Sequence, residues 1–144
     1  MSILSSTNTG KTAFLVPETK EELMEMIKKE IYEKGWKCDL NHIKTHKITD
    51  MSCIFMYANK FEGDISKWDV SNVENMSDMF YYSDFNGDIS KWNVSNVKDM
   101  VCMFGFSNFK NNISSWKINT KCNTKDMFDK CPIKEEYLPK IAEK

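Results

Sequence analysis

Apolar residues recur along this chain at intervals of 24 or 25 positions. The stretch GDISKWDVSNV at residues 63–73 returns at residues 87–97 with one change, from Asp69 to Asn93. The apolar residues around it share the same spacing: Phe61, Phe85 and Phe109; Ile65, Ile89 and Ile113; Trp68, Trp92 and Trp116; Val70, Val94 and Ile118; Met79, Met103 and Met127; Phe55, Phe80, Phe104 and Phe128. Repetition at a fixed interval of about 20 to 50 residues is typical of proteins in which one structural unit packs on the next. We therefore expect the fold itself to repeat.

The first part of each repeat predicts a short extended segment. In residues 65–70 the pattern shifts to a period of two, which places Trp68 and Val70 inward and Lys67 and Asp69 outward. Neighbouring parallel strands lie ~4.8 Å apart, so the equivalent tryptophans of successive repeats should form a ladder.

The second part of each repeat predicts one or two turns of helix. Residues 71–74 (Ser-Asn-Val-Glu) resemble a capping box, and Met76, Met79 and Phe80 follow at spacings of three and four. Asn86-Gly87 then supplies residue types that tolerate the positive φ angles of a tight turn. A bundle of amphipathic helices is the alternative, but the period of two and this turn dipeptide both oppose it.

The predicted fold class is an α/β solenoid. It consists of about four coils of 24–25 residues, with short parallel strands and short helices, capped by an N-terminal helix. The expected organisation is a single domain with a flexible segment at residues 1–16, a capping helix within 17–36, the solenoid at 37–133 and a C-terminal cap or tail at 134–144. Thr19 with Glu22 forms a capping box at the start of the helix, and Gly35 ends it.

Composition narrows the functional classes. The 144 residues carry a net charge of −1, with 41% hydrophobic and 28% charged residues, as in soluble globular proteins. Every basic residue other than histidine is lysine, which weighs against nucleic acid as a partner, because arginine forks are the usual contact to guanine and phosphate. No apolar run approaches the ~20 residues of a membrane span, and no signal peptide is recognised. As written, the chain is expected to be a cytoplasmic monomer with reduced cysteines and without membrane insertion.

Two motifs mimic ligand sites. Gly10-Lys11-Thr12 resembles the end of a phosphate-binding loop, but the first glycine and the preceding strand are missing. Cys38, His42 and His46 are spaced four apart, whereas structural zinc usually takes four ligands with closely paired cysteines. We predict no cofactor and no metal.

The sequence gives little support for a catalytic site or a calcium site. Cys102 lies among core methionines and phenylalanine without a histidine nearby in the sequence. Asp64, Asp88 and Asn112 form one row rather than a cage of six to eight or so oxygens, so capping of turns is the preferred interpretation. We therefore predict that the protein is not an enzyme, although a fold alone never excludes a grafted activity.

The repeat resembles a known bacterial family. The pattern Phe-Asn-Gly-Asp-Ile-Ser-Lys-Trp-x-Val-Ser-Asn-Val-x-x-Met-x-x-Met-Phe, over residues 39–133, is similar to the BspA-like repeat of mycoplasma-type surface proteins and lipoproteins, a domain of unknown function. Residues 17–23 resemble that family's lead-in helix. The resemblance implies a variant leucine-rich repeat with a parallel sheet, a location at the cell surface, and adhesion or binding of host proteins. Val73 and Val97 depart from the pattern where a classical leucine-rich repeat has asparagine or cysteine.

The outward positions of the expected strands form the candidate binding face. Inward residues stay the same between repeats while outward residues vary, which favours a framework that carries an interaction surface. We predict a non-enzymatic module for protein–protein interaction through this strand-side face, whose residues are Lys67, Asp69, Lys91, Asn93, Ser115 and Lys117. The alternative is a structural repeat element of a surface protein, an adhesin-like fragment without a partner of its own, in which exposed positions drift freely.

Overall fold

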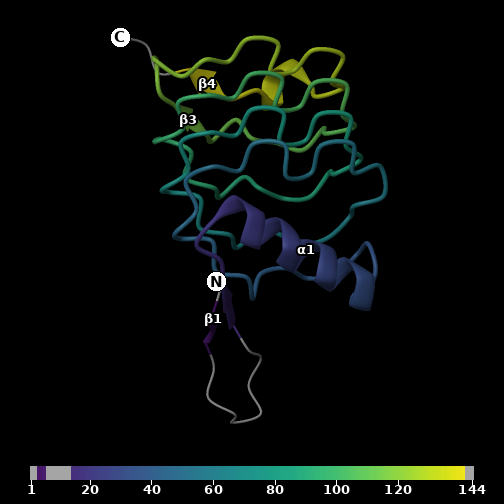
Figure 1. The fold of residues 1–144 in the computed structure, drawn as a ribbon. Coiled ribbons are helices and arrows are strands. Elements are labelled where there is room, and N and C mark those ends of the chain that lie inside the picture. Colours follow the sequence, from purple (N-terminus) through teal and green to yellow (C-terminus); the bar gives the residue numbers. More distant parts are fainter. Residues whose placement is uncertain (1–2, 6–13, 142–144) are drawn as a thin grey trace.

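The fold consists of one helix followed by a long series of turns (Figure 1). The computed structural model describes residues 3–5 and 14–141. Strand β1 (Ile3–Ser5) pairs antiparallel with β2 (Phe14–Val16), and α1 spans Lys20–Lys34. Near the C-terminus, β3 (Lys117–Ile118) pairs in parallel with β4 (Lys140–Ile141), and the 3-10 helix η1 (Glu135–Tyr137) lies between them in sequence. Residues 35–116 form turns and isolated bridges, without a further helix or strand.

The predicted α/β solenoid is therefore the wrong fold class. The described residues contain a single α-helix instead of one short helix in each repeat. Their four strands have two or three residues each and form two separate two-stranded sheets, so no parallel sheet runs through the repeats. The leucine-rich-repeat architecture implied by the sequence resemblance is likewise not found.

Left-handed residues explain why the predicted repeat helices do not form. Asp78 and Tyr82 have φ angles of 54° and 53°, and the equivalent residues of the other repeats share this conformation: Cys53, Tyr57, Cys102, Phe106, Asp126 and Lys130. An α-helix requires negative φ and bonds from each N–H to the carbonyl four residues earlier. In residues 76–82, alternate N–H groups instead donate to carbonyls of the next repeat, as Phe80 does to Met103 at 2.9 Å.

Side-chain acceptors explain why the predicted strands bend. The Oδ1 atom of Asp64 accepts a hydrogen bond from the N–H of Ser66 at 2.9 Å, and Asp69 accepts one from Ser71 at 3.0 Å. Such bonds close an Asx turn, which competes with extended backbone. The same contact, to the N–H two residues later, is made by Asp39, Asp50, Asn75, Asp88, Asn93, Asp99, Asn112, Asn119 and Asn123. Ser71 therefore belongs to a turn and not to the predicted capping box.

Gly63 and Gly87 allow a phenylalanine ring to pack closely against the backbone. The prediction that Asn86-Gly87 provides positive φ angles is wrong, because Gly35 is the one described glycine with positive φ. A Cβ atom at Gly87 would lie 2.7 Å from the Phe85 ring, and one at Gly63 would lie 2.5 Å from the Phe61 ring. Glycine is needed at these positions because the preceding ring occupies the space of a side chain.

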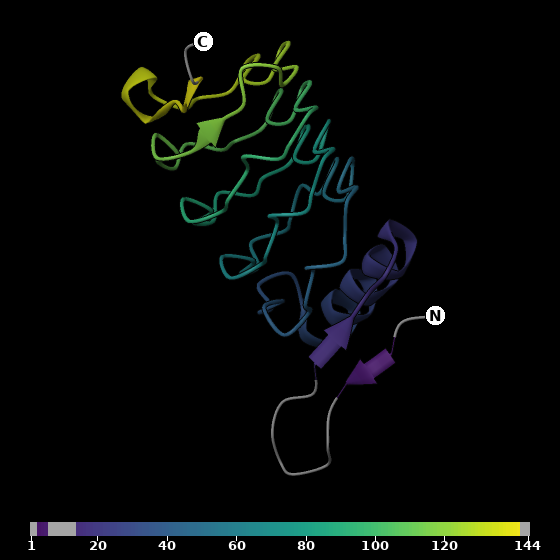
Figure 2. The ribbon, with the colours of Figure 1, turned by 90° about the vertical axis from the view of Figure 1, so that its left-hand side faces the viewer.

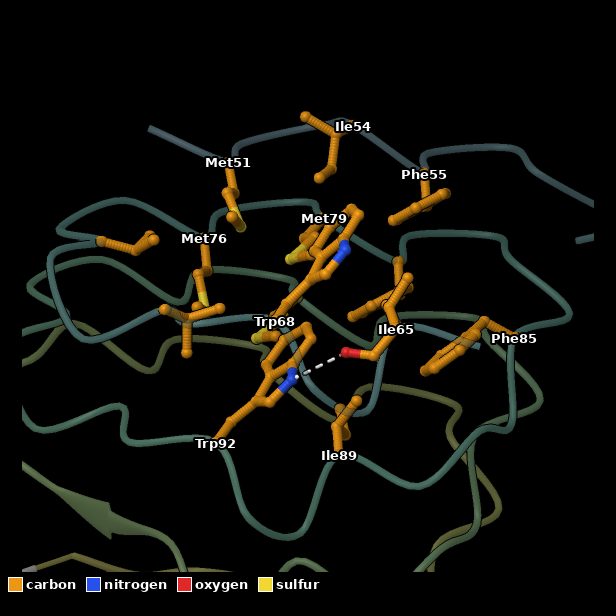
Figure 3. Packing of buried hydrophobic residues seen from close by; sticks show 14 of the residues in the cluster. Met51, Ile54, Phe55, Ile65, Trp68, Met76, Met79, Phe85, Ile89 and Trp92 are labelled. Atoms are coloured by element: carbon orange, nitrogen blue, oxygen red, sulfur yellow. Dashed lines mark hydrogen bonds between the residues drawn. The ribbon is translucent and has the colours of Figure 1, made fainter. Parts of the chain in front are cut away.

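Residues one repeat apart contact each other, as the side-by-side loops in Figure 2 show. Each buried indole donates a hydrogen bond to a carbonyl of the preceding repeat: Trp68 to Leu40 at 2.9 Å, Trp92 to Ile65 at 3.2 Å (Figure 3) and Trp116 to Ile89 at 2.9 Å. The rings of Phe55, Phe80, Phe104 and Phe128 stack in a row with centroids 5.6, 5.5 and 5.5 Å apart, and Trp92 stacks on Trp116 at 6.4 Å.

Helix α1 packs over the first repeat. Leu23, Met26 and Ile27 are buried in the core that the repeats share. The Thr19 side chain accepts a hydrogen bond from the Glu22 N–H, the Glu22 carboxylate accepts one from the Glu18 N–H, and Gly35 ends the helix with a φ of 89°. No helix within residues 3–5 and 14–141 is long and apolar enough to cross a membrane.

Part of the predicted N-terminal segment cannot be compared with the structure. Residues 6–13, which contain Gly10-Lys11-Thr12, lie outside the described residues, as do residues 1–2 and 142–144. The described part of the segment at 1–16 consists of the paired strands β1 and β2.

Replacing Trp92 with phenylalanine tests the indole bonds. Loss of the bond to Ile65 and of ring volume in the core should lower the free energy of unfolding by ~1–3 kcal/mol. Urea denaturation measures this change, and Trp36→Phe at a half-exposed indole is the control, with an expected change below about 0.5 kcal/mol. Equal effects of the two substitutions would contradict the proposed role of Trp92.

The Asx turns predict how stability depends on pH. Hydrogen bonds from the hydroxyl and N–H of the following serines hold the pKa values of Asp64, Asp69 and Asp88 below their usual range. A carboxylate with a lowered folded pKa stabilises the protein above its unfolded pKa of about 3.9, and this contribution is lost as pH falls through the folded pKa.

Replacing these three aspartates together with asparagine should therefore leave stability at neutral pH nearly unchanged. Asn93 and Asn112 already make the same bonds to Ser95 and Ser114, so the amide is a suitable substitute. Between about pH 4 and pH 2 the variant should lose less stability than the wild type, as measured by urea denaturation. Parallel pH profiles of the two proteins would show that the aspartates do not contribute in this way.

Candidate interaction surface

The six residues predicted to bind a partner are all exposed, but they do not lie on a sheet. Lys67, Lys91 and Ser115 belong to turns, and Asp69 and Asn93 each begin an Asx turn. Lys117 alone is in a strand, β3. The predicted strand-side face is thus a row of turns. We call these six residues the turn face.

Several residues of the turn face hold the backbone in place. The Oδ1 atom of Asp69 accepts bonds from both the N–H and the hydroxyl of Ser71, at 3.0 and 2.6 Å. Asn93 accepts the same two bonds from Ser95. The hydroxyl of Ser115 donates to the carbonyl of Ser90 at 3.0 Å. The exchange of aspartate for asparagine between repeats therefore preserves one structural acceptor, which weakens the inference that variation here reflects partner binding.

The row of Asp64, Asp88 and Asn112, for which turn capping was the preferred interpretation, also consists of structural acceptors. Asp64, Asp88 and Asn112 each use Oδ1 for the N–H and the hydroxyl of the serine two residues later. Among residues 14–141, no three histidine, cysteine, aspartate or glutamate side chains gather closely enough to hold a metal ion.

The three residues that mimic a zinc motif, Cys38, His42 and His46, lie in different environments. Cys38 is buried, His46 is exposed, and Nε2 of His42 lies 3.2 Å from the buried carboxylate of Glu30. Burial opposes ionisation of Glu30, but hydrogen bonds from Lys34 and His42 outweigh it and hold the pKa of Glu30 below its usual value. The contact between Glu30 and His42 joins α1 to the first repeat.

The cysteine singled out for nucleophilic chemistry is poorly suited to it. Burial, with smaller effects from Asp78, Asp126 and Asp129, raises the pKa of the Cys102 thiol. A raised pKa lowers the fraction of thiolate, which is the reactive form.

The structure contains an exposed row of aromatic side chains that the sequence interpretation missed. Tyr57, Tyr82 and Phe106 are 61%, 44% and 39% exposed. The rings of Tyr57 and Tyr82 stack with centroids 5.7 Å apart, and those of Tyr82 and Phe106 stack at 4.8 Å with an interplanar angle of 5°. We call these three residues the aromatic row. All three occupy one of the left-handed positions of the repeat, with φ angles of 60°, 53° and 53°.

Tyr81 supports the aromatic row from one side. Its ring makes edge contacts with Tyr57, Tyr82 and Phe106, at centroid distances of 6.1, 4.8 and 5.8 Å. Gly105 makes room for this ring, because a Cβ atom there would lie 2.9 Å from Cδ2 of Tyr81. The row is therefore a packed arrangement and not a set of isolated exposed side chains.

A second apolar surface lies between α1 and the first repeat. A groove of about 540 Å³ is lined by Met24, Ile27, Lys28, Ile31, Tyr32, Trp36, Ile54, Phe55 and Ala58. Two of its aromatic residues are exposed, Trp36 by 46% and Tyr32 by 92%.

Replacing Tyr82 with alanine should show the energetic coupling within the aromatic row. Loss of ring contacts with Tyr57, Tyr81 and Phe106 should lower the free energy of unfolding by about 1–2 kcal/mol. Tyr32→Ala is the matched control, since Tyr32 is almost fully exposed, and should change stability by less than about 0.5 kcal/mol. Urea denaturation would contradict the packing if the Tyr82 variant were as stable as the control.

Comparison with known proteins identifies a family. The model of one family, described as "Mycoplasma protein of unknown function, DUF285", matches residues 22–140. No curated protein and no solved structure matched the chain. The matched range contains α1 except its first two residues, all the repeats and β3, and covers well over half of the sequence. The chain therefore belongs to the DUF285 family of mycoplasma proteins of unknown function.

Proposed function

We propose that this protein is a non-enzymatic module that binds another protein through the aromatic row. The observation that supports the proposal is the exposure of Tyr57, Tyr82 and Phe106 as one contiguous stack. Exposed apolar residues are common singly, whereas contiguous ones mark interaction sites more often. Tyrosine and phenylalanine are also enriched at protein interfaces.

The physical character of the aromatic row suits a protein partner. The ring stacking and the edge contacts of Tyr81 restrict these side chains before binding, so little conformational entropy is lost on association. The row combines apolar ring carbons with the hydroxyl groups of Tyr57 and Tyr82. Asp78 lies on the same turn as Tyr82, and Asp84 follows this turn. A partner surface with apolar and basic residues would complement this combination.

The resemblance of the repeats to BspA-like proteins supports the same class of function. That family is associated with the cell surface and with adhesion or binding of host proteins, so both source-cell and host-cell proteins are candidate partners. The alternative proposal is a structural repeat element without a partner, in which the aromatic row serves stability alone.

The turn face is the second candidate surface. Its lysines at residues 67, 91 and 117 are exposed; Lys67 and Lys91 stand one repeat apart, and Lys117 is in register with Asn93. The turn face lacks exposed large apolar residues, so we rank it below the aromatic row.

Affinity capture with two variants separates these possibilities. One variant replaces Tyr57, Tyr82 and Phe106 with serine, and the other replaces Lys67, Lys91 and Lys117 with glutamate. Both are first checked for folding by circular dichroism, and quantitative mass spectrometry then measures proteins captured from source-cell and host-cell extracts. We expect the amount of captured protein to fall at least about tenfold with the aromatic variant and to stay unchanged with the lysine variant. Equal capture by wild type and the aromatic variant would refute this proposal, and selective loss in the lysine variant would favour the turn face.

A further inference from the structure

The last repeat presents a row of backbone N–H groups that have no acceptor among residues 3–5 and 14–141. In each of the three preceding repeats, four alternate N–H groups donate to carbonyls of the next repeat. The last complete set runs from Met100, Cys102, Phe104 and Phe106 to Asn123, Lys125, Met127 and Asp129, at 2.8, 3.0, 2.8 and 2.7 Å. The equivalent donors one repeat later are Thr124, Asp126, Phe128 and Lys130, and no acceptor for them is found within the described part of the chain.

The backbone of residues 124–130 has the same conformation as the equivalent segment of the preceding repeat, whose N–H groups are bonded. Asp126 and Lys130 have φ angles of 54° and 53°, nearly the same as the 55° and 53° of Cys102 and Phe106. The four N–H groups therefore face the next repeat position just as their equivalents do. We call Thr124 to Lys130 the donor edge. Unpaired edges of this kind are templates for pairing with another chain.

An apolar pocket adjoins the donor edge. Phe128 ends the buried row of phenylalanines, stacked on Phe104 with an interplanar angle of 2°, and is half-buried. The pocket has a volume of about 370 Å³ and is lined by Ile118, Thr124, Asp126, Met127, Phe128, Leu138, Pro139 and Ile141. In the inner repeats, the methionine and phenylalanine of the next turn cover the corresponding surface.

The described residues cover one half of this end of the molecule. Strand β4 pairs with β3, and the carbonyl of Tyr137 accepts a hydrogen bond from the Ile113 N–H at 3.1 Å. These contacts continue the first half of a repeat, near the C-terminus in Figure 1. The second half, opposite the donor edge, is not provided by the described residues.

We propose that the donor edge binds a segment of another polypeptide that carries the repeat's own Met-x-x-Met-Phe pattern and adds the missing half-turn. Two of the three equivalent edges inside the chain are filled by segments with this pattern, at residues 75–81 and 99–105. The third is filled by residues 123–129, in which Thr124 replaces the first methionine. The partner would supply four carbonyls to the N–H groups and a phenylalanine to the free face of Phe128.

A second copy of this chain fits the donor edge less well. Two donor edges cannot pair with each other, because both would present N–H groups. The complementary carbonyls would be those of the first repeat, at Asp50, Ser52, Ile54 and Met56, but α1 packs over that repeat and Lys20 donates a hydrogen bond to the Ser52 hydroxyl. The chemistry thus favours another protein with the same repeat.

Nuclear magnetic resonance with a defined peptide tests this inference. The probe is a synthetic peptide of residues 75–84 (NMSDMFYYSD), titrated into the ¹⁵N-labelled protein. We expect the amide signals of Thr124, Asp126, Phe128 and Lys130 to shift downfield and their hydrogen exchange to slow at least about tenfold. The control peptide carries Phe80→Asp and should bind at least about tenfold more weakly, because it cannot stack on Phe128.

Two protein variants locate the site. Phe128→Asp should lose at least about tenfold in affinity for the peptide, whereas Tyr82→Ala in the aromatic row should bind it like the wild type. If Phe128→Asp does not fold, the amide shifts of the wild-type protein decide alone. The inference is overturned if the peptide causes no shift at the donor edge, if the shifts centre on the aromatic row, or if ultracentrifugation shows self-association through the donor edge without peptide. The capture experiment tests the aromatic row with variants of Tyr57, Tyr82 and Phe106, none of which belongs to the donor edge, so failure here leaves the proposed function untouched.

Discussion

Hydrogen bonds between residues one repeat apart determine the rest of this structure. In residues 51–57, 76–82 and 100–106, every second N–H donates to a carbonyl of the following repeat, and the buried indoles bond to the repeat before. A buried polar group left without a partner costs about 1–3 kcal/mol, so these contacts restrict how neighbouring repeats can be placed. Identical sequence stretches such as residues 63–73 and 87–97 follow from this requirement, because like residues must meet like residues at each level.

The proposed surfaces are consequences of the same geometry. Left-handed residues turn alternate N–H groups toward the next repeat, and they also place Tyr57, Tyr82 and Phe106 in one exposed row. The series of bonds ends at residues 124–130, where the donor edge remains without acceptors from the described residues. The aromatic row and the donor edge thus arise from the repetition, whereas a grafted chemical site would need residues that break it.

The register of the repeats could be predicted from the sequence, but the type of local structure could not. The spacing of Phe55, Phe80, Phe104 and Phe128 is visible in the sequence, and these rings do stack in order. The α/β assignment failed because hydrophobic periodicity does not reveal a left-handed φ at an aspartate such as Asp78, nor an Asx turn at Asp64. Local hydrogen bonds from short polar side chains replaced both the expected strand and the expected helix.

The candidate surface was predictable only in part. Exposure of the six turn-face residues follows from their polar character between buried neighbours, and all six are exposed. The aromatic row was overlooked because a helix over residues 76–80 directs attention to inward spacings, although Tyr57, Tyr82 and Phe106 also stand in register. Aromatic residues that recur in register outside the buried set were the available signal. The donor edge could not be found in the sequence, since it depends on backbone direction alone.

The most direct test of this account is the measurement of scalar couplings across hydrogen bonds by nuclear magnetic resonance. The account predicts couplings that connect the N–H of Met76, Asp78, Phe80 and Tyr82 with the carbonyl carbons of Asp99, Val101, Met103 and Gly105. Couplings within residues 72–83 that join each N–H to the carbonyl four residues earlier would show a helix there, and would contradict it.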